Sequence, residues 1–346
     1  LQQLAREHRR ALGIPILALT GSNGKTTTKE LVHRVLSERF RTSATQGNLN
    51  NHIGVPLTLL AMTRDTEFGV VEMGASACGE ITLLCSIAEP NYGLITNIGR
   101  AHLDGFGGPE GVRRGKGELY DFLAANGGRA FVCRDDDVLT PMAAERDPLA
   151  AEYYPAALAE GMRHRLEGEY NRFNIAAAVA VGRYFDIDEE RIRHAVAGYV
   201  PDNHRSQRIE TPRNTVLADC YNANPSSMRA AIGHFRTESA GTHTQKALIL
   251  GDMLELGDWA QAEHEAILRL ALDEPATQLL LVGAAFAAAA DSVRRAPDAG
   301  AAAERIRCYP SREALEADLA ARPLSDALVL VKGSHGMRLD QLLGML

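Results

Sequence analysis

The chain has 346 residues, of which 45% are hydrophobic and 5% aromatic, and its formal net charge is −7. At roughly 100–200 residues per domain, this length suggests two domains and allows a sizeable buried core. The acidic balance and the scarcity of aromatic side chains argue against a nucleic-acid surface as the main partner.

Cysteine usage and apolar runs indicate the compartment. The five cysteines include no Cys-x-x-Cys pair, and an odd number spread over a long chain is not a disulfide framework. Reduced thiols predict a cytoplasmic protein. The longest apolar run, 279–290, is too short to span a bilayer, so we expect no membrane partner. We also expect the chain to be a monomer.

Short β-rich runs alternate with amphipathic stretches along the chain. This alternation predicts α/β domains with mostly parallel sheets covered by helices on both faces. A polar turn around Pro201, after a helix-like segment, predicts a boundary that separates domains 1–200 and 201–346. The predicted strands are 14–19, 68–73, 92–97, 130–133, 215–218, 247–250, 279–282 and 327–331, and the predicted helices include 29–38, 109–125, 174–184, 261–272 and 312–321.

The segment ALTGSNGKTTTKE, residues 18–30, lies between an apolar run and a helical pattern. Gly21 and Gly24 allow a sharp turn that points several backbone N–H groups at one place, and the following helix adds its positive end. This arrangement predicts a phosphate-binding loop, although Leu19 stands where the first glycine of the usual pattern would be. An ordinary strand-to-helix turn with a solvated lysine is the alternative. The predicted nucleotide residues are Gly21, Ser22, Asn23, Gly24, Lys25, Thr26 and Thr27.

Three further segments place polar side chains just after apolar runs or between glycines. Glu72 ends the run FGVVE, His102 follows YGLITNIGRA, and Lys116 stands between two glycines. Taken alone, each has a plain explanation: a capping carboxylate, an ordinary loop histidine and a solvated lysine. A carboxylate such as Glu72 at the carboxyl end of a strand could instead bind Mg²⁺ beside the phosphates, and a loop histidine such as His102 could be a metal ligand.

The variant T-G-S-N-G-K-T resembles the phosphate loop of the Mur ligases and of their relatives, the folylpolyglutamate synthases. The resemblance implies an α/β fold in which a P-loop mononucleotide-binding central domain with a mostly parallel sheet precedes a smaller Rossmann-like domain. It also implies an ATP-dependent, amide-forming enzyme that uses Mg²⁺ at two sites. By this resemblance Thr26, Glu72, His102 and Lys116 hold the metal, with Lys116 carbamylated by CO₂, and Arg114 is a neighbouring basic alternative.

Segments on either side of the expected boundary resemble the family's nucleoside-binding parts. EGEYNRFNIAAA keeps the spacing of two asparagines that lie near adenine, although Tyr170 replaces the usual histidine. By position, either asparagine could equally cap a helix. The resemblance implies ATP contacts from Asn171, Asn174, Arg205 and Asp219, and catalytic roles for Lys25, His102, Lys116 and Arg205.

The segment DCYNANPSSMRAA, 219–231, resembles those family members that add D-alanyl-D-alanine to a UDP-N-acetylmuramoyl-tripeptide. The asparagine-rich run GNLNNHIG and the late segment VKGSHGMRLD fit the same members. Turn formation is the alternative role for the asparagines, and a helix-surface charge for the arginine. The substrate-binding candidates are Asn48, Asn50, Asn51, His52, Asn222, Asn224, Lys332, Ser334 and Arg338.

The resemblance spans the chain from residue 20 to residue 340 and implies a reaction through an acyl phosphate in peptidoglycan precursor synthesis. It also implies two domains that close over the nucleotide. The family's N-terminal, UDP-binding domain has no counterpart in these residues, so we expect weak turnover by this chain alone. A ligase of the folylpolyglutamate synthase type and a nucleotide-binding regulatory module without ligase activity are the alternatives.

Overall fold

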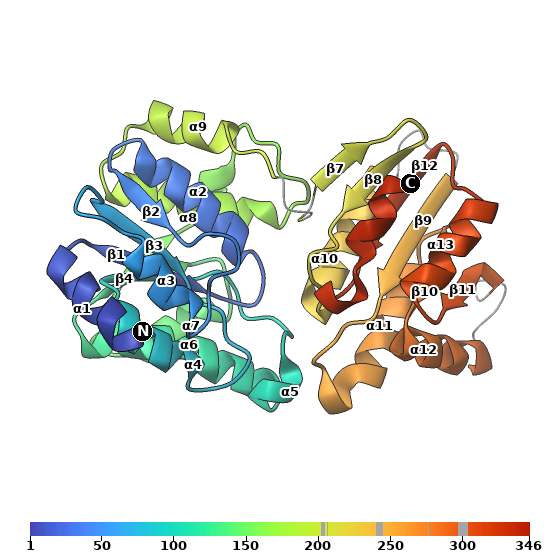
Figure 1. Cartoon of the computed structure of the whole chain (residues 1–346), viewed down its shortest axis with the longest axis horizontal. Coiled ribbons are helices and arrows are strands. Elements are labelled where there is room, and N and C mark those ends of the chain that lie inside the picture. The colour runs from blue at the N-terminus through green and yellow to red at the C-terminus, as the bar shows by residue number, and fades with distance from the viewer. Residues whose placement is uncertain (202–204, 206, 240–244, 276, 297–303) are drawn as a thin grey trace. The chain divides into compact units, whose positions relative to one another are not determined.

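The computed structural model describes the chain except for residues 202–204, 206, 240–244, 276 and 297–303. The chain forms two compact units (Figure 1). The first contains residues 1–100, 105–165 and 170–200, and the second contains residues 101–104, 166–169 and 201–346. Each unit has its own sheet and its own core, and each is described separately below.

The first unit is built on a six-stranded, fully parallel sheet of order β2-β3-β1-β4-β5-β6. From β1 the chain passes to β2 and β3 on one side of the sheet and then to β4 on the other. Such a reversal creates a crevice at the carboxyl ends of the strands, where ligands bind in open α/β sheets. The strands are β1 (Ile16–Thr20), β2 (Thr42–Ala44), β3 (Phe68–Glu72), β4 (Tyr92–Ile95), β5 (Arg129–Cys133) and β6 (Ala150–Tyr154).

Helices cover both faces of this sheet (Figure 1). One group packs α2 against α8 and α9, and the other packs α1 against α3 and α4, with α6 against α4. The three central strands β1, β3 and β4 are almost wholly buried, because they meet a helical layer on each face. The helices are α1 (Gln2–Leu12), α2 (Lys25–Ser37), α3 (Gly54–Leu60), α4 (Glu80–Ala88), α5 (Leu103–Phe106, grouped in part with the second unit), α6 (Pro109–Ala125), α7 (Leu139–Ala144), α8 (Asn171–Tyr184) and α9 (Glu189–Ala197), with a short 3₁₀ turn η1 (Ala156–Ala159).

The second unit carries a six-stranded sheet of order β11-β10-β9-β12-β8-β7, in which only the β7–β8 pair is antiparallel among the described pairings. The predicted mostly parallel α/β fold is therefore confirmed for both sheets. The strands are β7 (Gln207–Glu210), β8 (Asn214–Ala218), β9 (Gln245–Gly251), β10 (Gln278–Val282), β11 (Ile306–Tyr309) and β12 (Ala327–Lys332).

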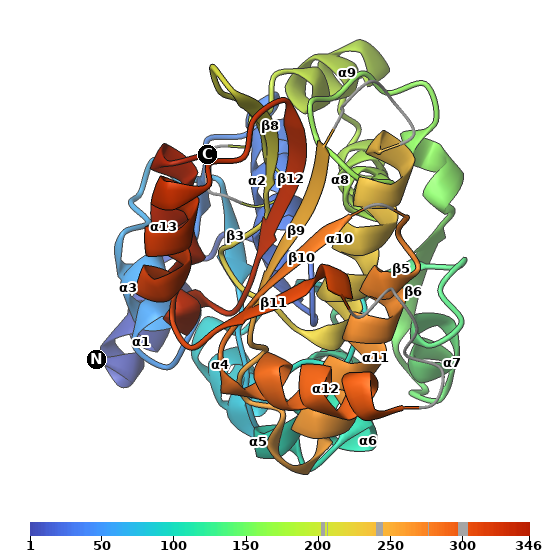
Figure 2. The same cartoon turned by 90° about the vertical axis from the view of Figure 1, so that its right-hand side faces the viewer.

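Figure 2 looks onto this unit and shows α13 on one side of the sheet and α10, α11 and α12 on the other. The core lies between the sheet and these helices and is rich in Leu, Val and Ile. The helices are α10 (Pro225–Glu238), α11 (Ala260–Leu272), α12 (Ala284–Arg295) and α13 (Arg312–Ala321), with 3₁₀ turns at Gly257–Trp259, His335–Met337 and Leu339–Gly344.

Candidate active site

The predicted phosphate loop follows β1, the strand at which the chain reverses direction across the sheet. The loop ends at Lys25, the first residue of α2, so the amino end of that helix faces the loop. Two residues at the end of β4 brace it: the side-chain amide of Asn97 donates to Asn23 O at 3.0 Å and accepts from Asn23 N at 3.1 Å, and Thr96 Oγ1 donates to Asn23 O at 2.6 Å. The loop is therefore held rigid from a neighbouring strand.

Both glycines of the loop are required by space and by backbone conformation. Gly21 has φ 143° and Gly24 has φ 78°, which side-chain-bearing residues rarely adopt. A Cβ at Gly21 would lie 2.0 Å from Thr96 Oγ1, and a Cβ at Gly24 would lie 2.5 Å from Asn174 Oδ1. Leu19, which stands where the usual pattern has its first glycine, lies fully buried inside β1, before the turn begins.

Lys25 folds back over the loop. Its Nζ donates to Gly21 O at 2.8 Å and to Ser22 O at 3.2 Å. The ammonium group therefore lies next to the turn formed by Gly21 and Ser22, where a phosphate held by the loop would meet it. Thr26 and Thr27 are buried in the first turn of α2.

Glu72 ends β3 beside the same loop, because β1 pairs with β3 in a register that sets Leu19 opposite Glu72. The side chain is only 1% exposed. Its Oε1 accepts from Asn50 Nδ2 at 2.8 Å, whereas Oε2 is buried without a hydrogen-bond partner among the described residues. A buried carboxylate oxygen without a donor is costly, so this oxygen fits a position facing a cation.

Lys116 projects from α6 and is also only 1% exposed, whereas Arg114 on the same helix is exposed. Its Nζ donates to Ala75 O at 2.9 Å, three residues beyond Glu72. Burial, reinforced by the positive charge of Lys25, holds the pKa of Lys116 well below its usual value, while Glu80 and Glu118 partly oppose this. Lys116, rather than Arg114, therefore has the buried position that a metal-side ligand needs.

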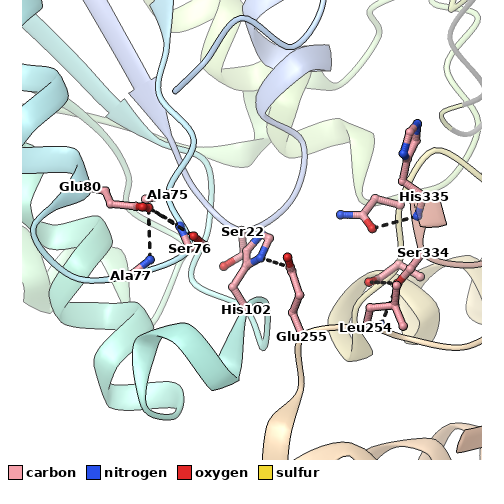
Figure 3. Close-up of polar contacts among 12 residues, drawn as sticks. Ser22, Ala75, Ser76, Ala77, Glu80, His102, Leu254, Glu255, Ser334 and His335 are labelled. Atoms are coloured by element: carbon pink, nitrogen blue, oxygen red, sulfur yellow. Dashed lines mark hydrogen bonds and ion pairs between the residues drawn. The ribbon is translucent and has the colours of Figure 1, made fainter. Parts of the chain in front are cut away.

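The segment between Glu72 and α4 is fixed by a carboxylate. Glu80 Oε2 accepts from Ser76 N at 2.6 Å and from Ala77 N at 3.2 Å, as Figure 3 shows. Because Ala75 lies directly before these residues, Glu80 holds in place the carbonyl that binds Lys116.

Asn171 and Asn174 stand at the start of α8 next to the phosphate loop. Asn174 Oδ1 accepts from Thr28 Oγ1 at 3.0 Å, and its Nδ2 donates to Asn171 Oδ1 at 2.8 Å. These contacts join α8 to α2. The pair therefore has a packing role, and its position beside Gly24 is also compatible with a nucleotide contact.

His102 groups with the second unit rather than with Glu72 and Lys116. Its Nδ1 contacts the carboxylate of Glu255, and this contact lowers the pKa of Glu255 (Figure 3). This contact lies within the second unit.

In the second unit, predicted residues gather where β8 and β12 end side by side. Lys332 is 1% exposed, and its Nζ donates to Asp219 Oδ2 at 2.5 Å and to Asn222 O at 3.1 Å. Ser334 Oγ accepts from Leu254 N at 2.9 Å (Figure 3). Asp219, Asn222, Lys332 and Ser334 therefore form one polar cluster.

Three other predicted residues lie around this cluster. Arg205 stacks on Tyr221, with its guanidinium carbon 3.6 Å from the ring centroid. Asn224 caps α10 by accepting from Ser227 N at 2.9 Å, which is the turn role that its sequence position allows. Arg338 is exposed.

The predicted asparagine-rich loop lies between β2 and α3. Asn50 reaches Glu72, whereas Asn51 Oδ1 accepts from Ile53 N at 3.0 Å and Gly54 N at 2.9 Å and so begins α3. Asn48 and His52 are exposed. Only Asn50 of this run therefore joins the buried polar network.

Sequence reasoning missed the residues that support the site, namely Thr45, Glu80, Thr96, Asn97 and Glu255. Thr45 Oγ1 accepts from Glu72 N at 3.0 Å, and the two β4-end residues brace the loop. Thr96 and Asn97 carried a weak signal, because they form the carboxyl end of the predicted strand 92–97. Their role depends on β4 lying next to β1, which the sequence order of the strands does not specify.

Another group of metal-ligand types lies away from these residues. Among the described residues, Glu167, His234 and Glu238 have ligand atoms within 4.8 Å of one another. Arg208 already pairs with Glu238 at 2.8 Å, so a cation there would compete with this guanidinium. None of the three was predicted as a ligand.

Comparison with known proteins assigns the chain. Residues 19–160 match the Mur ligase middle domain, and residues 204–335 match the Mur ligase, glutamate ligase domain. The chain belongs to the Mur ligase family. No helix among the described residues is long and apolar enough to cross a membrane.

Relatives narrow this assignment within the Mur ligases. The chain is 34% identical to the UDP-N-acetylmuramoyl-tripeptide–D-alanyl-D-alanine ligase of Bacillus subtilis, over 99% of this chain and 78% of the relative. It superposes on a crystal structure of MurF from Acinetobacter baumannii with a TM-score of 0.84 and 28% identity, covering 99% of this chain and 79% of that one. The MurF ligase of Thermotoga maritima, solved in complex with ADP, shares the fold with a TM-score of 0.79 and 24% identity, covering 99% and 82%.

Proposed function

We propose that this chain joins D-alanyl-D-alanine to a UDP-N-acetylmuramoyl-tripeptide with consumption of ATP, as its relatives are named for doing, in cytoplasmic synthesis of the peptidoglycan precursor. The observation that carries this proposal is the phosphate loop on β1 beside the buried Glu72 carboxylate, whose Oε2 lacks a donor among the described residues. The main obstacle to this reaction is the repulsion between the substrate carboxylate and the γ-phosphate of ATP, which are both anions. Positive charge at the site lowers this obstacle, so no serine or cysteine nucleophile is needed.

The chemistry begins at the terminal carboxylate of the tripeptide, which is a poor electrophile. One of its oxygens attacks the γ-phosphorus of ATP, the bond to the bridging oxygen breaks, and ADP leaves with that electron pair. The amine of D-alanyl-D-alanine then attacks the acyl phosphate carbon, loses a proton, and inorganic phosphate leaves as the amide forms. Lys25 and the loop N–H groups bind and orient the phosphates, where fixed positive charge stabilises the transferring group.

For the metal, we propose that Thr26, Glu72, His102 and Lys116 hold Mg²⁺, with two ions in all. Bound Mg²⁺ would supply charge neutralisation on the phosphoryl oxygens. The free Oε2 of Glu72 supports this set from within the first unit. In His102, Nδ1 contacts Glu255, which leaves Nε2 as the ring nitrogen that would face the ion.

We further propose that Lys116 is carbamylated. A neutral amine attacks the carbon of CO₂, a C–N bond forms, and one amine proton passes to a base in solution, which leaves a carbamate anion. The lowered pKa of Lys116 supports this step, because it favours the neutral, nucleophilic amine. A ¹³C NMR spectrum of the protein in ¹³C-bicarbonate should show one carbamate signal that is absent from Lys116→Met; an unchanged spectrum would exclude the modification.

For the two parts of the chain, we propose that residues 1–200 are the central ATP-binding domain and 201–346 the C-terminal domain. The Asp219–Lys332 ion pair, Asn222 and Ser334 are proposed to serve the ribose and the incoming dipeptide, with Arg205 reaching the phosphates. Their convergence at the carboxyl ends of β8 and β12 supports a binding role.

The decisive experiment measures inorganic phosphate release by this protein supplied with ATP and Mg²⁺. We expect release only when both the UDP-tripeptide and D-alanyl-D-alanine are present, and loss of it in Glu72→Gln but not in the surface variant Arg64→Gln. Turnover with glutamate instead of D-alanyl-D-alanine would favour a folylpolyglutamate synthase-like ligase. Tight ATP binding without any turnover would favour a regulatory module.

A further inference from the structure

A cavity of about 870 Å³ lies in the first unit, at the opposite end of the sheet from the phosphate loop. Tyr92 and Arg129, which open β4 and β5, line it, whereas the phosphate loop follows the end of β1. Parts of α1, α4, α6 and α8 complete the wall. Its volume falls in the range of small-molecule sites.

The lining of this cavity is positively charged, whereas the chain as a whole is negatively charged. Four arginines, Arg6, Arg9, Arg10 and Arg129, line it together with one acidic residue, Glu89, so its walls carry four positive charges and one negative charge. The whole chain has 37 basic and 44 acidic residues. A basic cavity in an acidic chain concentrates anions.

Two of the arginines are already used by the fold. Arg9 is buried and donates from Nε to Ala88 O at 2.9 Å and from its terminal nitrogen to Glu89 O and to Asn91 Oδ1, both at 2.9 Å. Arg10 pairs with Glu89, with the shortest N–O distance 2.6 Å, and also contacts Glu7 at 3.0 Å. The one acidic group in the wall is therefore neutralised, and the end of α4 is fixed.

The other two arginines form no direct ion pair with a carboxylate among the described residues, although Arg6 lies close enough to Glu89 to help lower the pKa of that carboxyl. Arg6 Nε is buried and lacks any hydrogen-bond partner there. Arg129 is half-buried and lies over the ring of Tyr184, with its guanidinium carbon 5.6 Å from the ring centroid, which orients the group. The buried Nε of Arg6 and the solvent-facing guanidinium of Arg129 match the oxygens of a phosphate.

We propose that this cavity binds a small phosphate ester, with the phosphate between Arg6 and Arg129 and the rest of the molecule against Tyr92 and Tyr184. Backbone hydrogen bonds hold the floor in place, since Asn91 N donates to Ile16 O and Arg129 N donates to Asn91 O, at 2.9 and 3.0 Å. The site is separate from the phosphate loop, so its occupancy does not depend on the proposed ligase function.

The test is isothermal titration of the chain saturated with ADP and Mg²⁺, which keeps the phosphate loop occupied. The probes are ribose 5-phosphate, inorganic phosphate as the bare anion, and citrate as a carboxylate of higher negative charge. We expect one saturable site for ribose 5-phosphate, weaker binding of phosphate, and weakest binding of citrate. Affinity should fall with rising salt.

Matched variants locate the site. Arg6→Gln and Arg129→Gln should each weaken ribose 5-phosphate binding by about tenfold or more, since each removes charge-assisted donors. Arg129→Lys keeps the charge but loses the planar fork, so we expect an intermediate loss. Arg64→Gln removes an exposed arginine elsewhere in the same unit and should change nothing.

Three results would overturn the proposal: no saturable binding of ribose 5-phosphate, binding that survives both Gln substitutions, or citrate binding as tightly as the phosphate ester. Thermal melting of each variant checks that it is folded. If Arg129→Gln does not fold, the affinity of Arg6→Gln for ribose 5-phosphate decides the proposal. ATP binding by the same variants at the phosphate loop should be unchanged, which separates failure here from failure of the ligase proposal.

Discussion

The environment of Glu72 shows how single residues fix the direction of a buried carboxylate. Thr45 Oγ1 holds its backbone N–H, and Asn50 Nδ2 holds one carboxylate oxygen, so the other oxygen keeps a fixed direction. Asn50 is fixed in turn, because its backbone carbonyl oxygen accepts a hydrogen bond from Gly74 N at 2.8 Å. Asn50 is thus a positioning residue for the proposed metal ligand.

Asn50→Ala should therefore lower the affinity for ADP about tenfold when Mg²⁺ is present, because partners of a metal ligand typically contribute on that scale. Calorimetric titration with and without Mg²⁺ measures this. Asn48→Ala, in the same loop but exposed, serves as the control. An equal loss in the absence of Mg²⁺ would mean that Asn50 acts on the nucleotide or the fold and not through Glu72.

The buried Lys116 makes the stability of the folded chain depend on pH, and the direction of this dependence follows from its lowered pKa. Because burial holds its pKa below the ordinary value, the unfolded chain binds more protons than the folded chain between the lowered pKa and about 10.5. The contribution of Lys116 to stability thus rises with pH through that window and is least favourable below it.

We therefore expect Lys116→Met to be more stable than the unsubstituted chain at pH 7 in CO₂-free buffer, with the advantage shrinking toward pH 10. Urea denaturation at pH 7, 8.5 and 10 provides the free energies of unfolding. Lys246→Met replaces a half-buried lysine in the second unit and should show no such trend. A constant difference at all three pH values would contradict the assigned protonation.

At the level of strands, the sequence located the interior of each sheet and missed the margins. All eight predicted strands exist, with ends shifted by up to two residues. The four unpredicted strands, β2, β6, β7 and β11, are the outer strands of the two sheets. Central strands read as continuous apolar runs because helices cover both faces, whereas outer strands such as β7 alternate half-buried and exposed residues.

Substitution of Gly24 tests the fit between the phosphate loop and α8. Gly24→Ala combines a left-handed φ with a Cβ 2.5 Å from Asn174 Oδ1. We therefore expect it to lower the free energy of unfolding by about 2–3 kcal/mol and to abolish ADP binding. Gly13→Ala has a similar φ of 63° but meets nothing within 4 Å, so it should cost only about 1–2 kcal/mol and leave ADP binding intact. Thermal melts and ADP titration compare the two; equal effects would show that the contact with Asn174 is unimportant.

His264 in α11 fixes the segment that leads from β9 to that helix. Its Nε2 accepts from Met253 N at 2.9 Å, and Nδ1 lies 2.7 Å from Ala260 O, an arrangement that requires the neutral ring. Burial lowers the pKa of His264 below its usual 6.5. The unfolded chain thus gains the proton first, so this stabilisation is complete above about pH 6.5 and declines as the pH falls below it.

We expect His264→Ala to cost about 3 kcal/mol at pH 7.5, because it leaves a cavity and two unsatisfied backbone groups, and less at pH 5. His194→Ala, whose side chain is 83% exposed, should cost little at either pH. Melting temperatures at the two pH values measure both effects. A cost for His264→Ala that is equal at both pH values would refute the neutral-ring assignment.

The molecule as a whole consists of two units with separate cores, and its single tryptophan, Trp259, reports on only one of them. We expect urea unfolding followed by Trp259 fluorescence and by far-UV circular dichroism to give different midpoints, because each sheet can unfold with its own helices. Phe235 lies in the fully buried core of the second unit. Phe235→Ala should therefore lower the free energy of unfolding that Trp259 fluorescence reports by about 3–5 kcal/mol. Coincident transitions in both proteins would show that the units unfold as one.

The sequence by itself determined the class of fold, the central strands and the glycine turn between β1 and α2, because each depends on short-range features: apolar runs, glycine positions and a lysine at a helix start. Only the tertiary structure decided what surrounds them. The bracing of the loop by Thr96 and Asn97, the Asn50–Glu72 contact and the arginine-lined cavity all join segments far apart in the chain. They depend on which strands lie side by side, and strand order follows from packing of the whole sheet rather than from any local pattern.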